Sequence, residues 1–73
     1  MMTGRELLRI VTRLGCEIVR QRGSHVRVRC SWCRTSVPVH AGEDLKVGLM
    51  SKIERDLAPC LGPGWLRKAR ERR

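Results

Sequence analysis

The segment His25–Cys30 alternates strictly between apolar and polar side chains. A repeat of two residues is typical of a β-strand that buries one face and exposes the other. The apolar side comprises Val26, Val28 and Cys30, and the polar side comprises His25, Arg27 and Arg29. Gly23 and Ser24 precede the strand and favour a tight turn, so a second strand is expected to pair with it. The valine side should then pack on helices, and the histidine side should face solvent.

The residues before Gly15 predict an amphipathic helix. Thr3 precedes Glu6 by three positions, which is the spacing of a capping box, and Gly15 stands where a helix typically ends. The apolar positions between them repeat at helical spacing and are Leu7, Leu8, Ile10, Val11 and Leu14. A second, positive face carries Arg5, Arg9 and Arg13. Such a face is either simply solvated or in contact with RNA or an acidic protein.

Two further strands are predicted beside His25–Cys30. The first spans residues 16–21, and its inward side is left open at this length. Its two sides are Cys16, Ile18 and Arg20 on one, and Glu17, Val19 and Gln21 on the other. The third spans residues 35–40, after a connection at residues 31–34. Pro38 cannot donate a hydrogen bond to a neighbouring strand, so the third strand is expected at an edge of the sheet.

A second helix of about ten residues is predicted after Gly48, because apolar side chains again recur at helical spacing. Its apolar stripe is Leu49, Met50, Ile53 and Leu57. Pro59 is expected to end this helix. The remainder, from Trp65 onward, is either a short third helix or a mobile arm. The chain therefore divides into a domain at residues 1–58 and a basic C-terminal extension at residues 59–73.

The order of one helix, three strands and one helix predicts an α+β fold of two layers. A three-stranded antiparallel sheet would carry both helices on one face, which is the layout of double-stranded-RNA-binding domains. A chain of 73 residues forms one small domain with a thin core. Any chemistry is therefore expected on an open surface rather than in a deep pocket.

The charge balance predicts a polyanionic partner. Sixteen Lys and Arg residues face seven Asp and Glu residues, which gives a formal net charge of +9. Such an excess indicates nucleic acid first. The chain has two Trp and no Phe or Tyr, which disfavours the aromatic platforms on which single-stranded bases stack. We therefore expect contacts to the RNA backbone.

The absence of a signal peptide and of a long apolar run predicts a cytoplasmic chain without membrane contact. The four cysteines are then expected to be reduced. Cys30 and Cys33 have the spacing of half a zinc knuckle, but neither Cys16 nor Cys60 belongs to a second pair. We expect small buried hydrophobes rather than a metal site, and no cofactor, although metal binding at Cys30 and Cys33 is left open.

His25 is the candidate catalytic residue, because imidazole is well suited to proton transfer near neutral pH and arginine is well suited to binding phosphate. From the residues alone, His25 is either an acid–base group or an ordinary surface histidine at the start of a strand. His40 could supply a second proton-transfer group or simply end a strand. The candidate RNA contacts are Arg22, Gly23, Ser24, Arg27, Arg29 and Lys46.

Three segments carry a family resemblance, and they occur in the order Gly23-Ser24-His25, Val37-Pro38-Val39-His40 and Asp44-Leu45-Lys46-Val47-Gly48. With the opening helix, they resemble the HicA family of bacterial toxins over roughly residues 3–58. The resemblance implies a small mRNA interferase with a double-stranded-RNA-binding-like fold. It places the catalytic histidine after the Gly-Ser pair, at His25. It also implies an antitoxin of the HicB family that binds and silences the toxin.

The hypothesis from the sequence is a toxin that cleaves mRNA as a metal-independent endoribonuclease and is inhibited by a HicB-like antitoxin. The expected chemistry is attack of a 2′-hydroxyl on the adjacent phosphate while His25 moves the proton. The alternative is a non-catalytic RNA-binding module of the same fold.

Overall fold

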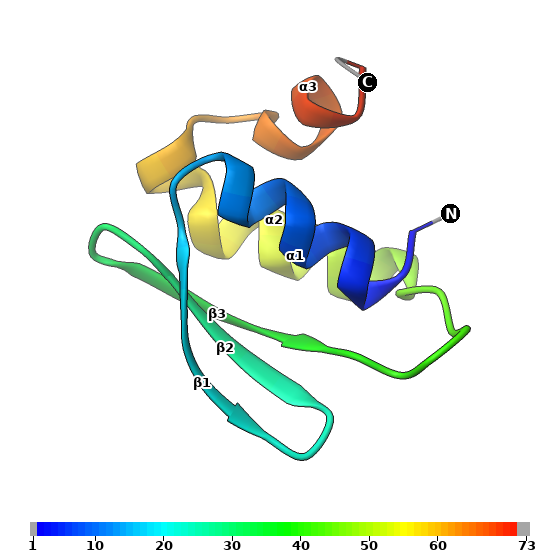
Figure 1. Cartoon of the computed structure of the whole chain (residues 1–73). Helices are drawn as coiled ribbons and strands as arrows, with labels where there is room; N and C mark the ends of the chain where they lie inside the picture. The colour runs from blue at the N-terminus through cyan, green and yellow to red at the C-terminus, as the bar shows by residue number, and fades with distance from the viewer. Residues whose placement is uncertain (1, 72–73) are drawn as a thin grey trace.

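The computed structural model describes residues 2–71 and shows a three-stranded antiparallel sheet with helices on one of its faces (Figure 1). The elements are α1 (Gly4–Arg13), β1 (Glu17–Arg22), β2 (His25–Cys30), β3 (Cys33–Pro38), α2 (Val47–Leu61) and α3 (Trp65–Glu71). The strands lie in the order β1-β2-β3, so β2 is central. The predicted α+β fold is confirmed. Residues 72 and 73 of the predicted basic extension lie outside the described residues.

The predicted cap of α1 is confirmed. The Thr3 backbone N–H donates to Glu6 Oε1 at 2.8 Å, and the Glu6 backbone N–H donates to Thr3 Oγ1 at 3.2 Å. Gly4 then begins the helix in close contact with the end of β3, because a Cβ atom at Gly4 would lie 2.1 Å from the Pro38 carbonyl oxygen. Because glycine has no side chain, the start of α1 can pack directly against the backbone at the end of β3.

The core lies between the sheet and the helices. The valine side of β2 is buried as predicted, and its polar side is exposed. The most deeply buried side chains come from α1, α2, β2 and β3, and they are Leu7, Val11, Val28, Val37, Ile53 and Leu57. Since the helices cover only this face, the other face of the sheet remains open to solvent.

The predicted alternation along the first strand is wrong, because β1 contains a bulge. Ile18 pairs with Val28, and the next paired residue is Arg20, opposite Arg27. Val19 is the extra residue between them. Ile18 and Arg20 therefore lie on opposite faces instead of sharing one, and every later residue of β1 changes face relative to the prediction.

The second helix extends past Pro59, contrary to prediction. Pro59 lies inside α2, which ends at Leu61. A proline in the last turn removes only one hydrogen bond of the helix, and the Gly62 N–H closes the end by donating to the Ala58 carbonyl at 2.7 Å. The connection between β2 and β3 is also shorter than predicted. It consists of the two-residue turn Ser31-Trp32, so β3 begins and ends two residues earlier than expected.

The segment after α2 is a third helix, which was one of the two predicted alternatives. Trp65 and Leu66 are each only 4% exposed, and they anchor α3 on the other helices. The Trp65 indole Nε1–H donates to the Glu54 carbonyl oxygen at 2.9 Å. Across residues 2–71, none of the helices combines the length and apolar character that a membrane crossing requires.

The expectation of reduced cysteines is wrong for this structure. Cys16 is paired with Cys30, and Cys33 is paired with Cys60. The first disulfide joins the start of β1 to the end of β2. The second joins the start of β3 to the last turn of α2. Sequence spacing could not show these pairings, because three different pairings are compatible with four cysteines.

Candidate functional site

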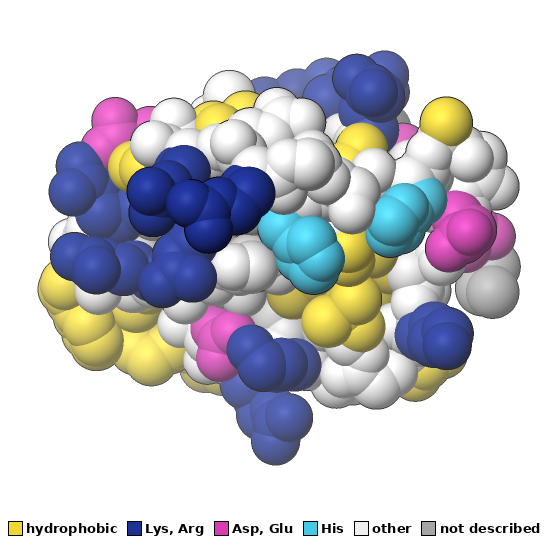
Figure 2. Space-filling view, turned by 90° about the horizontal axis from the view of Figure 1, so that it is seen from below, with side chains coloured by type: hydrophobic (Ala, Val, Ile, Leu, Met, Phe, Trp, Pro, Cys, Tyr) yellow, Lys and Arg dark blue, Asp and Glu magenta, His cyan; other side chains and the backbone are white. Residues whose placement is uncertain are grey.

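The open face of the sheet carries most of the candidate site residues. Residues directly opposite in neighbouring strands share a face, so the strand register arranges the side chains in three rows. The rows are Arg22, His25 and Pro38; then Arg20, Arg27 and Ser36; then Glu17, Arg29 and Arg34. Basic side chains gather on this face, and both histidines of the chain are visible beside them (Figure 2). Except for Glu17 and Pro38, the residues of these rows line a shallow basic depression of about 770 Å³, together with Val19.

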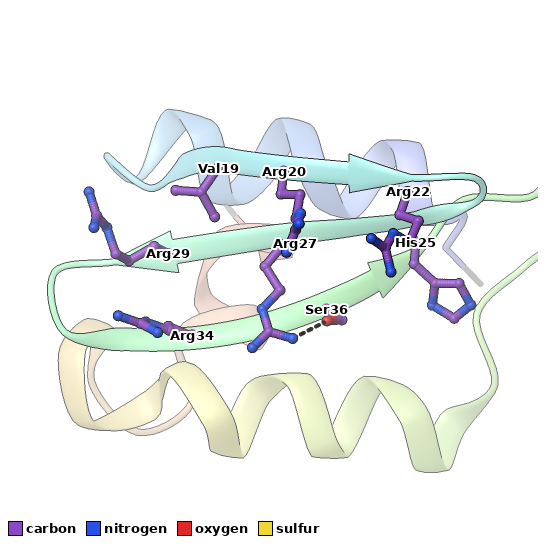
Figure 3. A pocket seen from close by; sticks show the side chains of 8 residues that line it. All are labelled: Val19, Arg20, Arg22, His25, Arg27, Arg29, Arg34 and Ser36. Carbon is purple, nitrogen blue, oxygen red and sulfur yellow. Dashed lines mark hydrogen bonds between the residues drawn. The ribbon is translucent and has the colours of Figure 1, made fainter.

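His25 begins β2 directly after the turn formed by Gly23 and Ser24. Gly23 has a φ of 59°, which a glycine adopts without strain. The imidazole is exposed at the edge of the depression, next to Arg22 (Figure 3). Within residues 2–71, no carboxylate or other side chain forms a hydrogen bond with this ring. The ring is therefore accessible to a substrate but has no orienting partner of the kind found in catalytic triads.

Five arginines line the depression, and they differ in how far they are neutralised. Arg29 forms an ion pair with Glu17. Arg27 lies in the middle of the face and directs its Nη1 toward Ser36 Oγ at 3.4 Å (Figure 3). Arg20, Arg22, Arg27 and Arg34 have no acidic partner among the described residues. Four guanidinium groups are thus available to an anion.

His40 is held near the turn that carries His25. The Val39 backbone N–H donates to the Ser24 carbonyl oxygen at 2.6 Å, which continues the pairing of β2 and β3 beyond the last strand residue. His25 faces Pro38 in the register, so His40 follows at the diagonal position on the same side. His40 is exposed, and Figure 2 shows both imidazoles on this face.

The structure brings together four of the seven predicted catalytic and RNA-binding residues, namely Arg22, His25, Arg27 and Arg29. Gly23 and Ser24 form the adjoining turn. Lys46 is the N-cap residue of α2 and is not among the residues that line the depression. Arg20 and Arg34 line it but were not predicted. The sequence did not reveal the bulge in β1 that brings Arg20 to this face. The alternation of Arg34 with Cys33 and Thr35 could have indicated that the Arg34 side chain points outward.

One carboxylate with a shifted pKa lies on the other side of the sheet. Asp56 of α2 accepts hydrogen bonds from Lys52 Nζ and from Thr35 Oγ1, both at 2.9 Å. The bond from Lys52 lowers the pKa of Asp56 below its usual value, outweighing the burial that raises it. Thr35 is only 5% exposed, so this carboxylate satisfies its buried hydroxyl and joins α2 to β3.

Residues 2–71 contain no group of three or more histidine, cysteine or acidic side chains arranged to hold a metal ion, and all four cysteines are paired in disulfides. A sulfur atom in a disulfide is not a thiolate, and the thiolate is the form that ligates metals.

A model of the HicA toxin family of bacterial toxin–antitoxin systems matches residues 4–58, which is about three quarters of the chain. The chain belongs to the HicA toxin family. No curated protein and no solved structure matches it. The resemblance inferred from the sequence is thus confirmed, and membership makes the chain a toxin of a toxin–antitoxin system, with an antitoxin as its implied partner. The HicA match includes the whole basic depression and stops before Cys60 and α3.

Proposed function

We propose that this HicA toxin is an endoribonuclease that cleaves mRNA at the open face of its sheet. One observation carries the proposal, namely an exposed histidine on the same sheet face as four arginines that have no acidic partner within residues 2–71. A group that moves protons thus lies beside groups that bind phosphate, on a rigid sheet.

The reaction that fits this arrangement is attack of a ribose 2′-hydroxyl on the adjacent phosphorus. His25 accepts the hydroxyl proton as the new P–O bond forms. The P–O bond to the next nucleotide breaks, which leaves a 2′,3′-cyclic phosphate and a 5′-hydroxyl. Arg22 and Arg27 flank His25 along the face and stabilise the added negative charge on the phosphate oxygens.

The leaving 5′-oxygen needs a proton, and His40 is the side chain placed to supply it. His40 stands diagonally from His25 on the same face, and the hydrogen bond from Val39 to Ser24 fixes its backbone there. A pair of imidazoles, one accepting and one donating a proton, completes the transfer without a change in total protonation. Neither ring has an orienting carboxylate among the described residues, so we expect slow turnover.

The depression favours contacts to the RNA backbone over contacts to bases. Apart from the imidazole of His25, none of its lining side chains is aromatic. Guanidinium groups spread over three rows can follow successive phosphates of a single strand. We therefore expect cleavage to depend weakly on base identity and strongly on salt concentration.

The implied antitoxin is proposed to be a HicB-like protein that covers the His25 face. Acidic side chains of this partner would pair with the same four guanidinium groups that bind RNA. Covering one open face would block both RNA binding and proton transfer.

Replacement of His25 by Ala tests the catalytic assignment. Because general acid–base catalysis contributes about 10²–10⁴-fold, we expect His25→Ala to lose at least about 100-fold in RNA cleavage and to stop arresting growth. RNA binding and thermal stability should stay near wild type. Cleavage that persists in His25→Ala would contradict the assignment. If the wild-type toxin binds RNA but never cuts it, the chain is a non-catalytic RNA-binding module.

A further inference from the structure

All four cysteines gather at the end of the molecule opposite His25. Cys30 and Cys33 face each other directly across β2 and β3, and each is only 3% exposed on the helix side of the sheet. Cys16 adjoins Cys30, and Cys60 adjoins Cys33. In Figure 1, the start of β1, the turn between β2 and β3 and the end of α2 meet at this corner. The structure thus supplies the two partners that the half-knuckle at Cys30 and Cys33 lacks in the sequence.

We propose that the reduced form of this corner binds one zinc ion through Cys16, Cys30, Cys33 and Cys60. Four cysteine thiolates around one zinc ion are a common closed structural site, and two cysteines separated by two residues often supply half of it. The two-residue turn Ser31-Trp32 gives Cys30 and Cys33 that spacing. Cys16 and Cys60 complete the tetrahedron from two other elements.

The geometric change that zinc binding requires within each cysteine pair is small. A Zn–S bond of about 2.3 Å places tetrahedral sulfur atoms about 3.8 Å apart. Sulfur atoms in a disulfide are about 2.0 Å apart, so the two sulfur atoms of each pair must move about 1.8 Å further apart. The Cα atoms of Cys16 and Cys30 are 4.3 Å apart, and those of Cys33 and Cys60 are 6.2 Å apart. Within each pair, rotation of the side chains can therefore supply most of the separation of the two sulfur atoms.

The two forms are related by a balanced redox step. Each disulfide accepts two electrons and two protons from a dithiol reductant, which itself becomes a disulfide. The four resulting thiols lose their protons as Zn²⁺ binds, so zinc binding releases protons and weakens at low pH. The half-buried Cys60 makes its disulfide the more accessible of the two to the reductant.

The proposed zinc ion is structural and does not belong to the reaction at His25. Cys30 lies five positions after His25 along β2, which is roughly 17 Å at about 3.3 Å per residue. The cysteines face the helices, whereas His25 faces solvent. A small domain has little core to stabilise it, and zinc would join β1, the β2–β3 turn and α2 through one centre.

Metal analysis of the full chain, purified without a histidine tag or chelator, tests the site. The protein is reduced anaerobically with a dithiol, supplied with ZnCl₂ and freed of excess metal. We expect one zinc per chain, and we expect four thiols to react with a thiol reagent only after chelation. Substitution with Co²⁺ should give the absorption of tetrahedral cobalt thiolate. Four reactive thiols with no retained zinc, or disulfides that resist the dithiol in the folded chain, would overturn the proposal.

Single substitutions assign the ligands. Cys60→Ser should lower the zinc affinity by more than the roughly 10–100-fold that loss of an outer-shell partner costs. His25→Ala and His40→Ala are the matched controls, because they remove the two histidines of the chain and should retain one zinc per chain. Equal zinc affinity in Cys60→Ser and wild type would exclude Cys60 as a ligand. The wild-type stoichiometry keeps the test decisive if Cys60→Ser does not fold.

Discussion

Removal of one arginine from the open face should change the salt dependence of RNA binding by a predictable amount. Each phosphate neutralised on a single strand contributes about −0.7 to the slope of log affinity against log salt. Four arginines of the depression lack an acidic partner among the described residues. The wild-type slope should therefore be about −2.8, and affinity should fall about 50-fold between 50 mM and 200 mM salt. In Arg27→Ala the slope should be about −2.1, with an affinity loss of about 20-fold over the same range.

The assay is fluorescence anisotropy with a short, unstructured 2′-O-methyl RNA. Methylation removes the attacking hydroxyl, so binding is measured without cleavage. Arg9→Ala is the matched control, because it removes the same charge from α1, away from the depression. Its slope should remain that of the wild type. The proposed RNA interface would be wrong if Arg9→Ala made the slope as shallow as Arg27→Ala does. It would also be wrong if only Arg9→Ala made the slope shallower.

Three further outcomes follow from contacts elsewhere in the chain. Glu17→Gln should release Arg29 and make the slope of RNA binding steeper by about 0.7, measured in the same anisotropy titration. Gly4→Ala should lower the free energy of unfolding by about 1–3 kcal/mol in a thermal melt, because the new Cβ meets the Pro38 carbonyl. The lowered pKa of Asp56 stabilises the fold above the unfolded value of 3.8, and this stability is lost as pH falls through the folded pKa. Asp56→Asn should therefore differ most from wild type near neutral pH.

Gly4→Ala has a matched control variant, and each of the three predictions has a result that would contradict it. Gly48 has open space where a Cβ would lie, so Gly48→Ala should be neutral or stabilising by up to about 1 kcal/mol. Equal melts for Gly4→Ala and Gly48→Ala would refute the close contact at Pro38. An unchanged slope in Glu17→Gln would contradict the view that the ion pair with Glu17 keeps Arg29 from binding phosphate. If the difference in unfolding free energy between Asp56→Asn and wild type stayed constant from pH 7 to pH 2, the ionised Asp56 carboxylate would not stabilise the fold as argued.

The parts of the fold that depend on local pattern could be predicted from the sequence. The bounds of β2 were predicted correctly because its alternation is uninterrupted and a glycine turn precedes it. The cap of α1 was predicted because Thr3 and Glu6 satisfy each other within one helical turn. The family resemblance was visible in the same way, since its three segments are short and contiguous.

The parts that depend on partners distant in the sequence could not be predicted. The bulge at Val19 exists only relative to β2, so the sequence of β1 alone wrongly suggested that Arg20 shares a side with Ile18. The end of α2 depends on Gly62 and on the bond to Cys33, which outweigh the local preference of Pro59 to stop a helix. The alternation of β2 predicted that Arg27 and Arg29 share a face with His25, but only the register showed that Arg20 and Arg22 share it too.

The bulge in β1 also affects how this toxin behaves at high concentration. β1 is an edge strand, and Ile18 and Val19 on it are 53% and 46% exposed. A regular edge with exposed apolar side chains invites pairing with the edge of a second copy. The bulge interrupts the row of unpaired backbone groups, and Arg20 and Arg22 add like charges that repel a second copy. The irregularity that places these arginines on the same face as His25 thereby also protects the chain from aggregation through its open edge.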